Sequence, residues 1–173
     1  KLGKPRLFFA VSPGNMDSMV NKYTANKRLR SEDAYSPDGR HDCRPDYPSI
    51  VYTQILKKLF PDVPVVIGGI EASLRRLTHF DYWQNKLRKS ILCDSGADML
   101  LYGVGAKSIL ALAEAIEQGR NIKKITEIPQ TVYLSSKDNI QGGITDKDII
   151  LHSYEECLQN KKAHTENFKY IEE

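Results

Sequence analysis

The stretch "VVIGGIEASLRR", residues 65–76, joins three β-branched residues to two glycines and then to an acid, a serine and two arginines. Short apolar runs that end at turn residues are typical of buried parallel strands. The same pattern occurs at four places along the chain, which are "RLFFAV" (6–11), "VPVVIGG" (63–69), "DMLLYG" (98–103) and "TVYLSS" (131–136). Each of these runs is therefore predicted to form a strand of one parallel sheet.

Helical patterns separate these strands. Apolar residues follow helical spacing over 46–60, where Asp46 or Ser49 could cap the helix and Pro61 could end it, and again over 106–118 before Gly119. Trp83, Leu87 and Ile91 suggest a third helix that stops at Gly96, and "SYEE" (153–156) matches a capping box that opens a final helix over 153–173. Strands that alternate with helices predict an α/β fold whose sheet is covered on both faces.

Composition limits the class of protein. With 173 residues, of which 40% are hydrophobic, the chain can build one core, so we expect a single α/β domain over 1–173. The net charge of +3 comes from 25 basic and 22 acidic residues, which does not indicate nucleic-acid binding. No apolar run approaches the length of a membrane helix. Nothing in the sequence indicates an oligomeric state.

The cysteines indicate the cellular compartment of the protein, and the two ends of the chain indicate whether it is a fragment. Cys43, Cys93 and Cys157 lie far apart without a C-x-x-C pair, which favours free thiols in a reducing compartment, so we expect a cytoplasmic protein. The chain opens at Lys1 without a signal-type segment, and its last residues read as helix. We therefore expect a piece of a longer protein.

Residues 12–45 interrupt the rhythm of strands and helices. This polar segment is much longer than the usual link between a strand and a helix, and it should lie over the edge of the sheet where open α/β folds bind ligands. Its candidate ligand-binding residues are Asn15, Asp17, Ser18, Arg28, Arg30, Asp33 and Tyr35. Asn15, Asp17 and Ser18 could instead cap a helix or form turns, and the arginines could instead pin the segment to Glu32, Asp33 or Asp38.

The glycine turns are the second candidate site, and its candidate ligand-binding residues are Gly68, Gly69, Glu71, Gly103 and Gly105. Gly68 and Gly69 let the backbone approach a ligand closely, but Glu71 could satisfy the amides of its own helix and pair with Arg75 one turn later. This possible role of Glu71 favours a plain turn followed by a self-capped helix over a phosphate-binding site. Gly103 and Gly105 begin a G-x-G motif that lacks the rest of the dinucleotide fingerprint.

No catalytic residue and no metal ligand is predicted. His41 and Cys43 lack a second pair with ligand spacing, so a surface loop explains them better than a metal site. His79 next to Asp81 could act as a base with an orienting acid, although the neighbouring aromatic residues favour a half-buried packing or capping role.

Three long stretches resemble the N-terminal region of the YgiQ family of radical S-adenosylmethionine proteins. They are "PRLFFAVSPGNMDSMVNKYTANKRLRSEDAYSPDG", "VPVVIGGIEASLRRLTHFDYWQNKLRKSILCDSGADMLLYG" and "ILHSYEE". The resemblance implies a flavodoxin-like fold related to cobalamin-binding domains, with three layers and a mainly parallel sheet, present here as an incomplete fragment. It also implies that this domain precedes a radical S-adenosylmethionine barrel of the same polypeptide.

The resemblance further implies a [4Fe-4S] cluster and S-adenosylmethionine in the full-length protein. Such a cluster needs three thiolates, usually spaced C-x-x-x-C-x-x-C, and the three cysteines of this chain do not have that spacing. No cofactor is therefore expected in this fragment, which should act as an accessory domain that is not catalytic alone. The alternative is a self-contained module that binds a nucleotide or cobalamin.

Overall fold

A four-stranded sheet forms the centre of the fold. The computed structural model describes residues 3–136 and 144–172. The strands lie in the order β1 (Phe9–Val11), β2 (Val65–Ile67), β5 (Met99–Leu101) and β6 (Thr131–Val132). The first three are parallel, but β6 pairs antiparallel with β5. The prediction of a buried parallel strand at 131–136 is therefore wrong. β6 is a two-residue edge strand that is only half buried, and antiparallel strands, unlike parallel ones, can be partly exposed to solvent.

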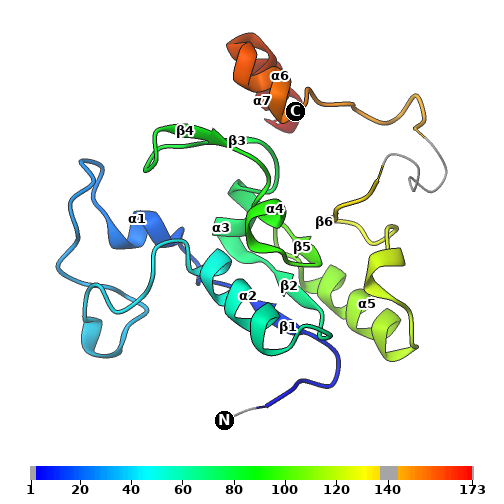
Figure 1. The fold of residues 1–173 in the computed structure, drawn as a ribbon, viewed down its shortest axis with the longest axis horizontal. Coiled ribbons are helices and arrows are strands. Elements are labelled where there is room, and N and C mark those ends of the chain that lie inside the picture. The colour runs from blue at the N-terminus through cyan, green and yellow to red at the C-terminus, as the bar shows by residue number, and fades with distance from the viewer. Residues whose placement is uncertain (1–2, 137–143, 173) are drawn as a thin grey trace.

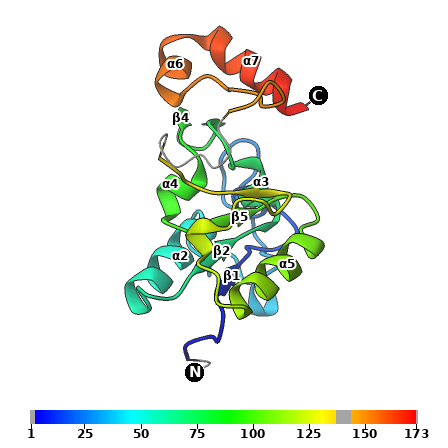
Figure 2. The same cartoon turned by 90° about the vertical axis from the view of Figure 1, so that its right-hand side faces the viewer.

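Helices cover both faces of the sheet, which gives the three layers of a flavodoxin-like fold (Figures 1 and 2). Side chains alternate along β2, because successive residues of a strand point to opposite faces. Val65 and Ile67 pack in one core with α2 (Pro48–Leu59), α3 (Gly69–Leu74) and α4 (Ile91–Ser95), while Val66 packs in a second core with α5 (Ala106–Glu117). Both sides of the central strands are thus buried, as the apolar runs predict.

Helix ends follow the sequence signals in part. Gly119 has φ +83° just after α5, as predicted for a residue that ends a helix. The predicted caps of α2 are wrong, because the N-cap is Tyr47 in a left-handed conformation and Pro48 opens the helix. Asp46 instead pairs with Lys22 at 2.9 Å, and Ser49 donates its amide to a distant carboxylate described below.

The predicted helix through Trp83 and Leu87 is wrong. Residues 79–88 form an antiparallel hairpin of β3 (His79–Asp81) and β4 (Lys86–Arg88), and α4 covers only Ile91–Ser95 before Gly96 ends it. The Asp81 carboxylate accepts the amide of Gln84 at 2.9 Å, and Asn85 takes a left-handed conformation in the turn. These local turn interactions override the helical spacing of the apolar residues.

The last described residues form two helices. The capping box at Ser153 is confirmed, and it opens α6 (Tyr154–Gln159), which is followed by α7 (Lys161–Glu172). Figures 1 and 2 place these helices beyond the β3–β4 hairpin, at the opposite end of the molecule from the N-terminus. A salt bridge of 3.0 Å joins Lys89 to Glu155 across this contact. Among the helices of the described ranges, none is long and apolar enough to cross a membrane.

Candidate functional site

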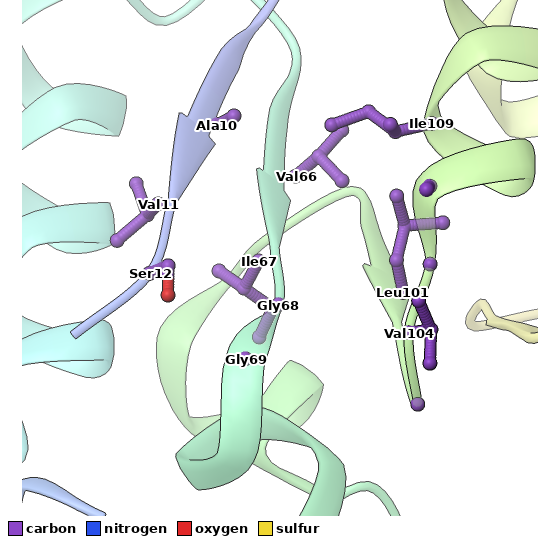
Figure 3. A pocket seen from close by; sticks show the side chains of 13 residues that line it. Ala10, Val11, Ser12, Val66, Ile67, Gly68, Gly69, Leu101, Val104 and Ile109 are labelled. Atoms are coloured by element: carbon purple, nitrogen blue, oxygen red, sulfur yellow. The ribbon is translucent and has the colours of Figure 1, made fainter. Parts of the chain in front are cut away.

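An open pocket of about 220 Å³ lies at the carboxyl ends of β1, β2 and β5. The connections after β2 and after β5 leave to opposite faces of the sheet, since α3 packs in one core and α5 in the other, and such divergence opens a crevice in α/β sheets. We call this the carboxyl-edge pocket. Its lining is aliphatic apart from glycine backbone and the Ser12 hydroxyl, as Figure 3 shows, and it includes Val66, Leu101, Val104 and Ile109.

The predicted glycines meet at this pocket. Gly68, Gly69, Gly103 and Gly105 all line it, although they come from two separate turns. Gly69 has φ +82°, and a Cβ atom added there would lie 2.6 Å from the Ser12 hydroxyl oxygen. The turn after β2 therefore requires glycine both for its backbone conformation and for its closeness to the chain after β1.

Glu71 does not cap its own helix, so this prediction is wrong. Its buried carboxylate accepts the Ser49 amide at 3.2 Å through Oε1, and the Ser18 amide at 3.3 Å and hydroxyl through Oε2. These donors belong to the first turns of α2 and of α1 (Ser18–Lys22). One carboxylate thus ties the start of two other helices to α3, and Ser18 is engaged inside the protein.

Arg75 pairs with Asp17 rather than with Glu71. The Arg75 guanidinium donates to Asp17 Oδ2, and both side chains are about nine-tenths buried. Asp17 Oδ1 also accepts hydrogen bonds from the amides of Met19 and Val20. Asp17 therefore caps α1, which is the alternative to ligand binding that the sequence left open for this residue. The segment 12–45 is therefore anchored to α3 by two buried contacts.

Asp33 organises the far part of this segment, which includes the short helix η1 (Pro37–Gly39). Its carboxylate takes a two-point contact from Arg44, at 2.8 and 3.0 Å, and accepts from the Asn21 amide at 2.7 Å and the Tyr35 backbone amide at 2.9 Å. Burial alone would raise the pKa of Asp33, but these hydrogen bonds lower it to about 2. Asp33 thus holds the segment together.

The other predicted residues of the segment differ in their surroundings. The Tyr35 hydroxyl accepts the Asn15 amide at 2.9 Å, and the Arg44 guanidinium lies 5.0 Å from the centre of the Tyr35 ring. Both arginines are exposed; Arg30 donates to the Val20 and Tyr23 carbonyls, whereas Arg28 contributes only its backbone to the contacts of the described residues. Neither arginine pairs with Glu32, Asp33 or Asp38 among the contacts of the described residues; Arg44 takes that role at Asp33.

His79 and Asp81 lie side by side on the inner face of β3. Burial lowers the pKa of His79, and its Nδ1 lies 3.0 Å from the Leu77 carbonyl oxygen. Asp81 accepts from the Tyr47 hydroxyl at 3.0 Å, and burial together with this bond raises the pKa of Tyr47. The sequence analysis missed Tyr47, whose partner Asp81 lies 34 residues along the chain, and Arg44, which lies 11 residues from Asp33. The place of Arg44 within the polar segment 12–45 could have suggested it.

No metal centre is found within the described residues. They contain no group of three or more histidine, cysteine, aspartate or glutamate side chains that could hold a metal ion. Cys43 and Cys93 are exposed free thiols, and Cys157 is buried beside Asn167 at 3.4 Å. His41 is exposed in a loop and contacts the Ser31 carbonyl. The residues of this chain do not fit an iron–sulfur cluster.

Comparison with known proteins identifies the family. The model of the family described as "Radical SAM N-terminal" matches residues 1–173. A UPF0313 protein of Bacteroides thetaiotaomicron is 59% identical, and the match covers 100% of this chain and 29% of that protein. UPF0313 proteins of Porphyromonas gingivalis and Clostridium perfringens are 58% and 49% identical, over 99% and 98% of this chain and 27% and 25% of theirs.

The matches cover all or nearly all of this chain but only part of each relative. No solved structure matches the chain. The chain spans less than a third of the curated relatives that it matches, so it corresponds to one part of longer polypeptides. The match to the family model is complete, and the identity to relatives is high. The chain therefore belongs to the radical SAM N-terminal family and corresponds to the N-terminal domain of a UPF0313-type protein.

Proposed function

We propose that this domain is the accessory part of a radical S-adenosylmethionine enzyme and that its carboxyl-edge pocket docks against the barrel of the same polypeptide. The observation that carries the proposal is the aliphatic lining of the pocket, with Val104 93% exposed at its rim. Contiguous exposed apolar surface is what a docking contact buries, and Val104 continues the aliphatic lining of the pocket to its rim. The three cysteines of the domain are free thiols, which suit the reducing conditions of the cytoplasm, and we propose that the protein works there.

The chemistry of the full-length protein would then come from the other part of the chain. A [4Fe-4S] cluster supplies the electron that cleaves S-adenosylmethionine, and its thiolates must come from residues outside this domain, because those present here do not fit it. The residues of this domain would position the barrel and limit access to it. The domain alone would not be catalytic.

The residues of segment 12–45 would serve this role from the neighbouring surface. The segment is fixed to α3 by Asp17 and Ser18 and its Ser12 lines the pocket, so the segment would form a firm wall beside it. Arg28 is exposed and only its backbone takes part in the contacts of the described residues, so it is the best placed of the predicted residues to meet the barrel or a ligand. Asn15, Tyr35 and Asp33 would support the wall from within.

The alternative function is a module that binds a nucleotide or cobalamin by itself. Positive-φ glycines and the uncapped start of α5 at the pocket favour it. The size and lining of the pocket disfavour it, because sites for such ligands usually measure about 300–1,000 Å³ and include polar groups that orient the ligand. The carboxyl-edge pocket offers about 220 Å³ and the Ser12 hydroxyl.

Replacing Val104 by aspartate in the full-length protein tests the proposal. The side chain is almost fully exposed, so folding of this domain should not change, while docking should weaken. We expect 5′-deoxyadenosine formation to fall about tenfold or more, as loss of roughly 1.4 kcal/mol of docking energy implies. Limited proteolysis should also release the domain.

The matched control is Leu59→Asp, which introduces the same charge at a residue 64% exposed at the end of α2. Leu59 precedes β2 and therefore lies at the amino end of the sheet, away from the pocket. Equal activity and equal proteolysis of the two variants would refute docking through this edge. A rise of several degrees in melting temperature with adenosylcobalamin or a nucleotide would favour the alternative.

A further inference from the structure

A second pocket, of about 210 Å³, lies between α1, the end of α3 and the β3–β4 hairpin. We call it the hairpin pocket. Its polar residues are Asp17, Arg75, His79 and Asp81, and aromatic side chains of the hairpin form part of its wall. It shares none of its lining residues with the carboxyl-edge pocket, so the inference below does not rest on the function proposed above.

Two buried hydrogen-bond acceptors on residues that line this pocket have no hydrogen-bond partner among the described residues. Asp81 is 3% exposed, and its Oδ1 is occupied by Tyr47 and Gln84, but its Oδ2 accepts no hydrogen bond. The nearest cation, Arg88, is 3.9 Å from Oδ2 and lies 2.8 Å from Asp94. A buried carboxylate oxygen without a donor costs free energy that a bound donor would recover.

His79 supplies the second acceptor. Its Nδ1 faces the Leu77 carbonyl oxygen at 3.0 Å, which places the ring hydrogen on Nδ1. Burial keeps the ring neutral by lowering the pKa of His79, so Nε2 carries a lone pair, and this buried atom also lacks a partner. Both unfilled positions therefore suit a ligand that donates hydrogen bonds.

The charges in the pocket favour a neutral ligand. Arg75 is paired with Asp17, so no unpaired cation in the pocket is available for a phosphate. Asp81 is the remaining charged group of the lining, and Arg88 lies close behind it. A neutral N–H donor satisfies the acceptors without adding an unbalanced buried charge.

The wall of the pocket favours a flat ring. Phe80 and Tyr82 are 53% and 51% exposed, and Trp83 stands edge-on to Tyr82 with ring centres 5.3 Å apart. The Lys27 ammonium already lies 4.7 Å from the centre of the Tyr82 ring, so the Phe80 ring offers the open aromatic face for another planar group. A cavity of about 150 Å³ can hold benzene, so 210 Å³ accommodates one ring or a fused pair.

We propose that the hairpin pocket binds a planar nitrogen heterocycle with an amino substituent, of the adenine or cytosine type. Its N–H groups would pair with Asp81 Oδ2 and His79 Nε2, and its ring would pack on the aromatic wall. Both acceptor atoms are covered in the structure, so entry requires neighbouring side chains to rotate. Leu74 and Phe80 can do so because both are more than half exposed.

The test measures binding of 9-methyladenine and 9-methylpurine to the full-length protein prepared without iron, by titration calorimetry. The two probes share their fused ring and differ in the amino group, and methylation removes the ring N–H from both. We expect 9-methyladenine to bind at least about tenfold more tightly, since one hydrogen bond to a charged group is worth that factor or more.

Variants assign the binding to this pocket. Asp81→Asn and Phe80→Leu should each weaken 9-methyladenine binding, by about tenfold and threefold. The controls Asp62→Asn and Phe168→Leu make the same substitutions at exposed residues elsewhere and should leave it unchanged. Phe80→Leu keeps the test valid if Asp81→Asn fails to fold, because Phe80 is half exposed.

Three results would overturn the proposal. One is equal affinity for the two probes, which would remove the role of the amino group. Another is wild-type affinity in Phe80→Leu together with wild-type affinity in any folded Asp81→Asn protein. The third is no detectable binding at about 10 mM 9-methyladenine, the result expected if another part of the polypeptide fills the pocket. None of these results depends on the activity of the barrel.

Discussion

Replacing Glu71 by glutamine should destabilise this domain far more than the same replacement of an exposed glutamate would. Glutamine keeps the length of the side chain, but only one of its two terminal atoms can accept hydrogen bonds. In the structure Oε1 accepts from Ser49 and Oε2 accepts from Ser18. After the substitution, the amide nitrogen must face one of these donors, so one buried backbone N–H loses its partner.

The expected magnitude follows from these contacts. A buried donor without a partner costs about 1–3 kcal/mol. Loss of the negative charge at the starts of α1 and α2 adds roughly 0.3–1 kcal/mol for each helix. The sum is about 2–5 kcal/mol. For a chain of this size, 1 kcal/mol shifts the melting temperature by about 2–4 °C, so we expect a decrease of roughly 5 °C or more.

Thermal and urea unfolding followed by circular dichroism measures this effect. The matched control is Glu117→Gln, which makes the same change in an exposed ion pair with Arg6, where 59% of the Glu117 side chain is accessible. That control should change stability by less than about 0.5 kcal/mol. If Glu71→Gln melts within about 2 °C of the control, the carboxylate does not tie the helices together, and our account of the junction is wrong.

Four further predictions can be checked on the same preparations. Gly69→Val should cost about 2 kcal/mol or more in urea unfolding, whereas Gly119→Ala, at a similar φ but in open space, should cost only the conformational part of about 1–2 kcal/mol. The pKa of Asp33 is depressed in the folded state, so its contribution to stability is complete above pH 4 and is lost as the pH falls towards 2; Asp33→Asn should flatten the urea stability profile across that window. Arg28→Ala should lower the free energy of unfolding by no more than about 0.5 kcal/mol, as exposed substitutions do. Arg30→Ala should lower it by more, because it removes two hydrogen bonds to backbone carbonyls; thermal unfolding measures both. Iron and sulfide reconstitution of the 173-residue chain should give no absorption of a [4Fe-4S] cluster; a stoichiometric brown protein would contradict the cysteine argument.

The layered fold could be predicted from the sequence because buried strands of an α/β sheet are nearly continuous apolar runs. The runs around Val65 and Met99 became central parallel strands, and Gly119 ended its helix as predicted. The hairpin at 79–88 could not be predicted in this way. Its apolar residues happen to follow helical spacing, while the turn is formed by the contact between Asp81 and Gln84 and by the left-handed conformation of Asn85.

The candidate site was predictable in its position but not in its contacts. The glycines at 68, 69, 103 and 105 do line one pocket, since the carboxyl ends of parallel strands meet at one edge. The roles of Glu71 and Arg75 were misassigned because spacing along one helix favours a local pair, whereas the protein uses both residues for long-range contacts. A buried polar side chain selects its partner in three dimensions, and spacing alone does not show that choice.

The helix α3 links the parts of the molecule that our proposals use. Gly69 at its start lines the carboxyl-edge pocket, Glu71 holds the first turns of α1 and α2, and Arg75 at its end binds Asp17 in the floor of the hairpin pocket. These three residues lie within two turns of one short helix, so a shift of α3 must move both pockets together. Binding in the hairpin pocket should therefore alter docking at the carboxyl edge, and by linkage docking should alter that binding to the same extent. Measuring 9-methyladenine affinity in Val104→Asp, which loses docking but touches no residue of the hairpin pocket, reveals this coupling. An affinity equal to that of the wild type would show that the two pockets act independently.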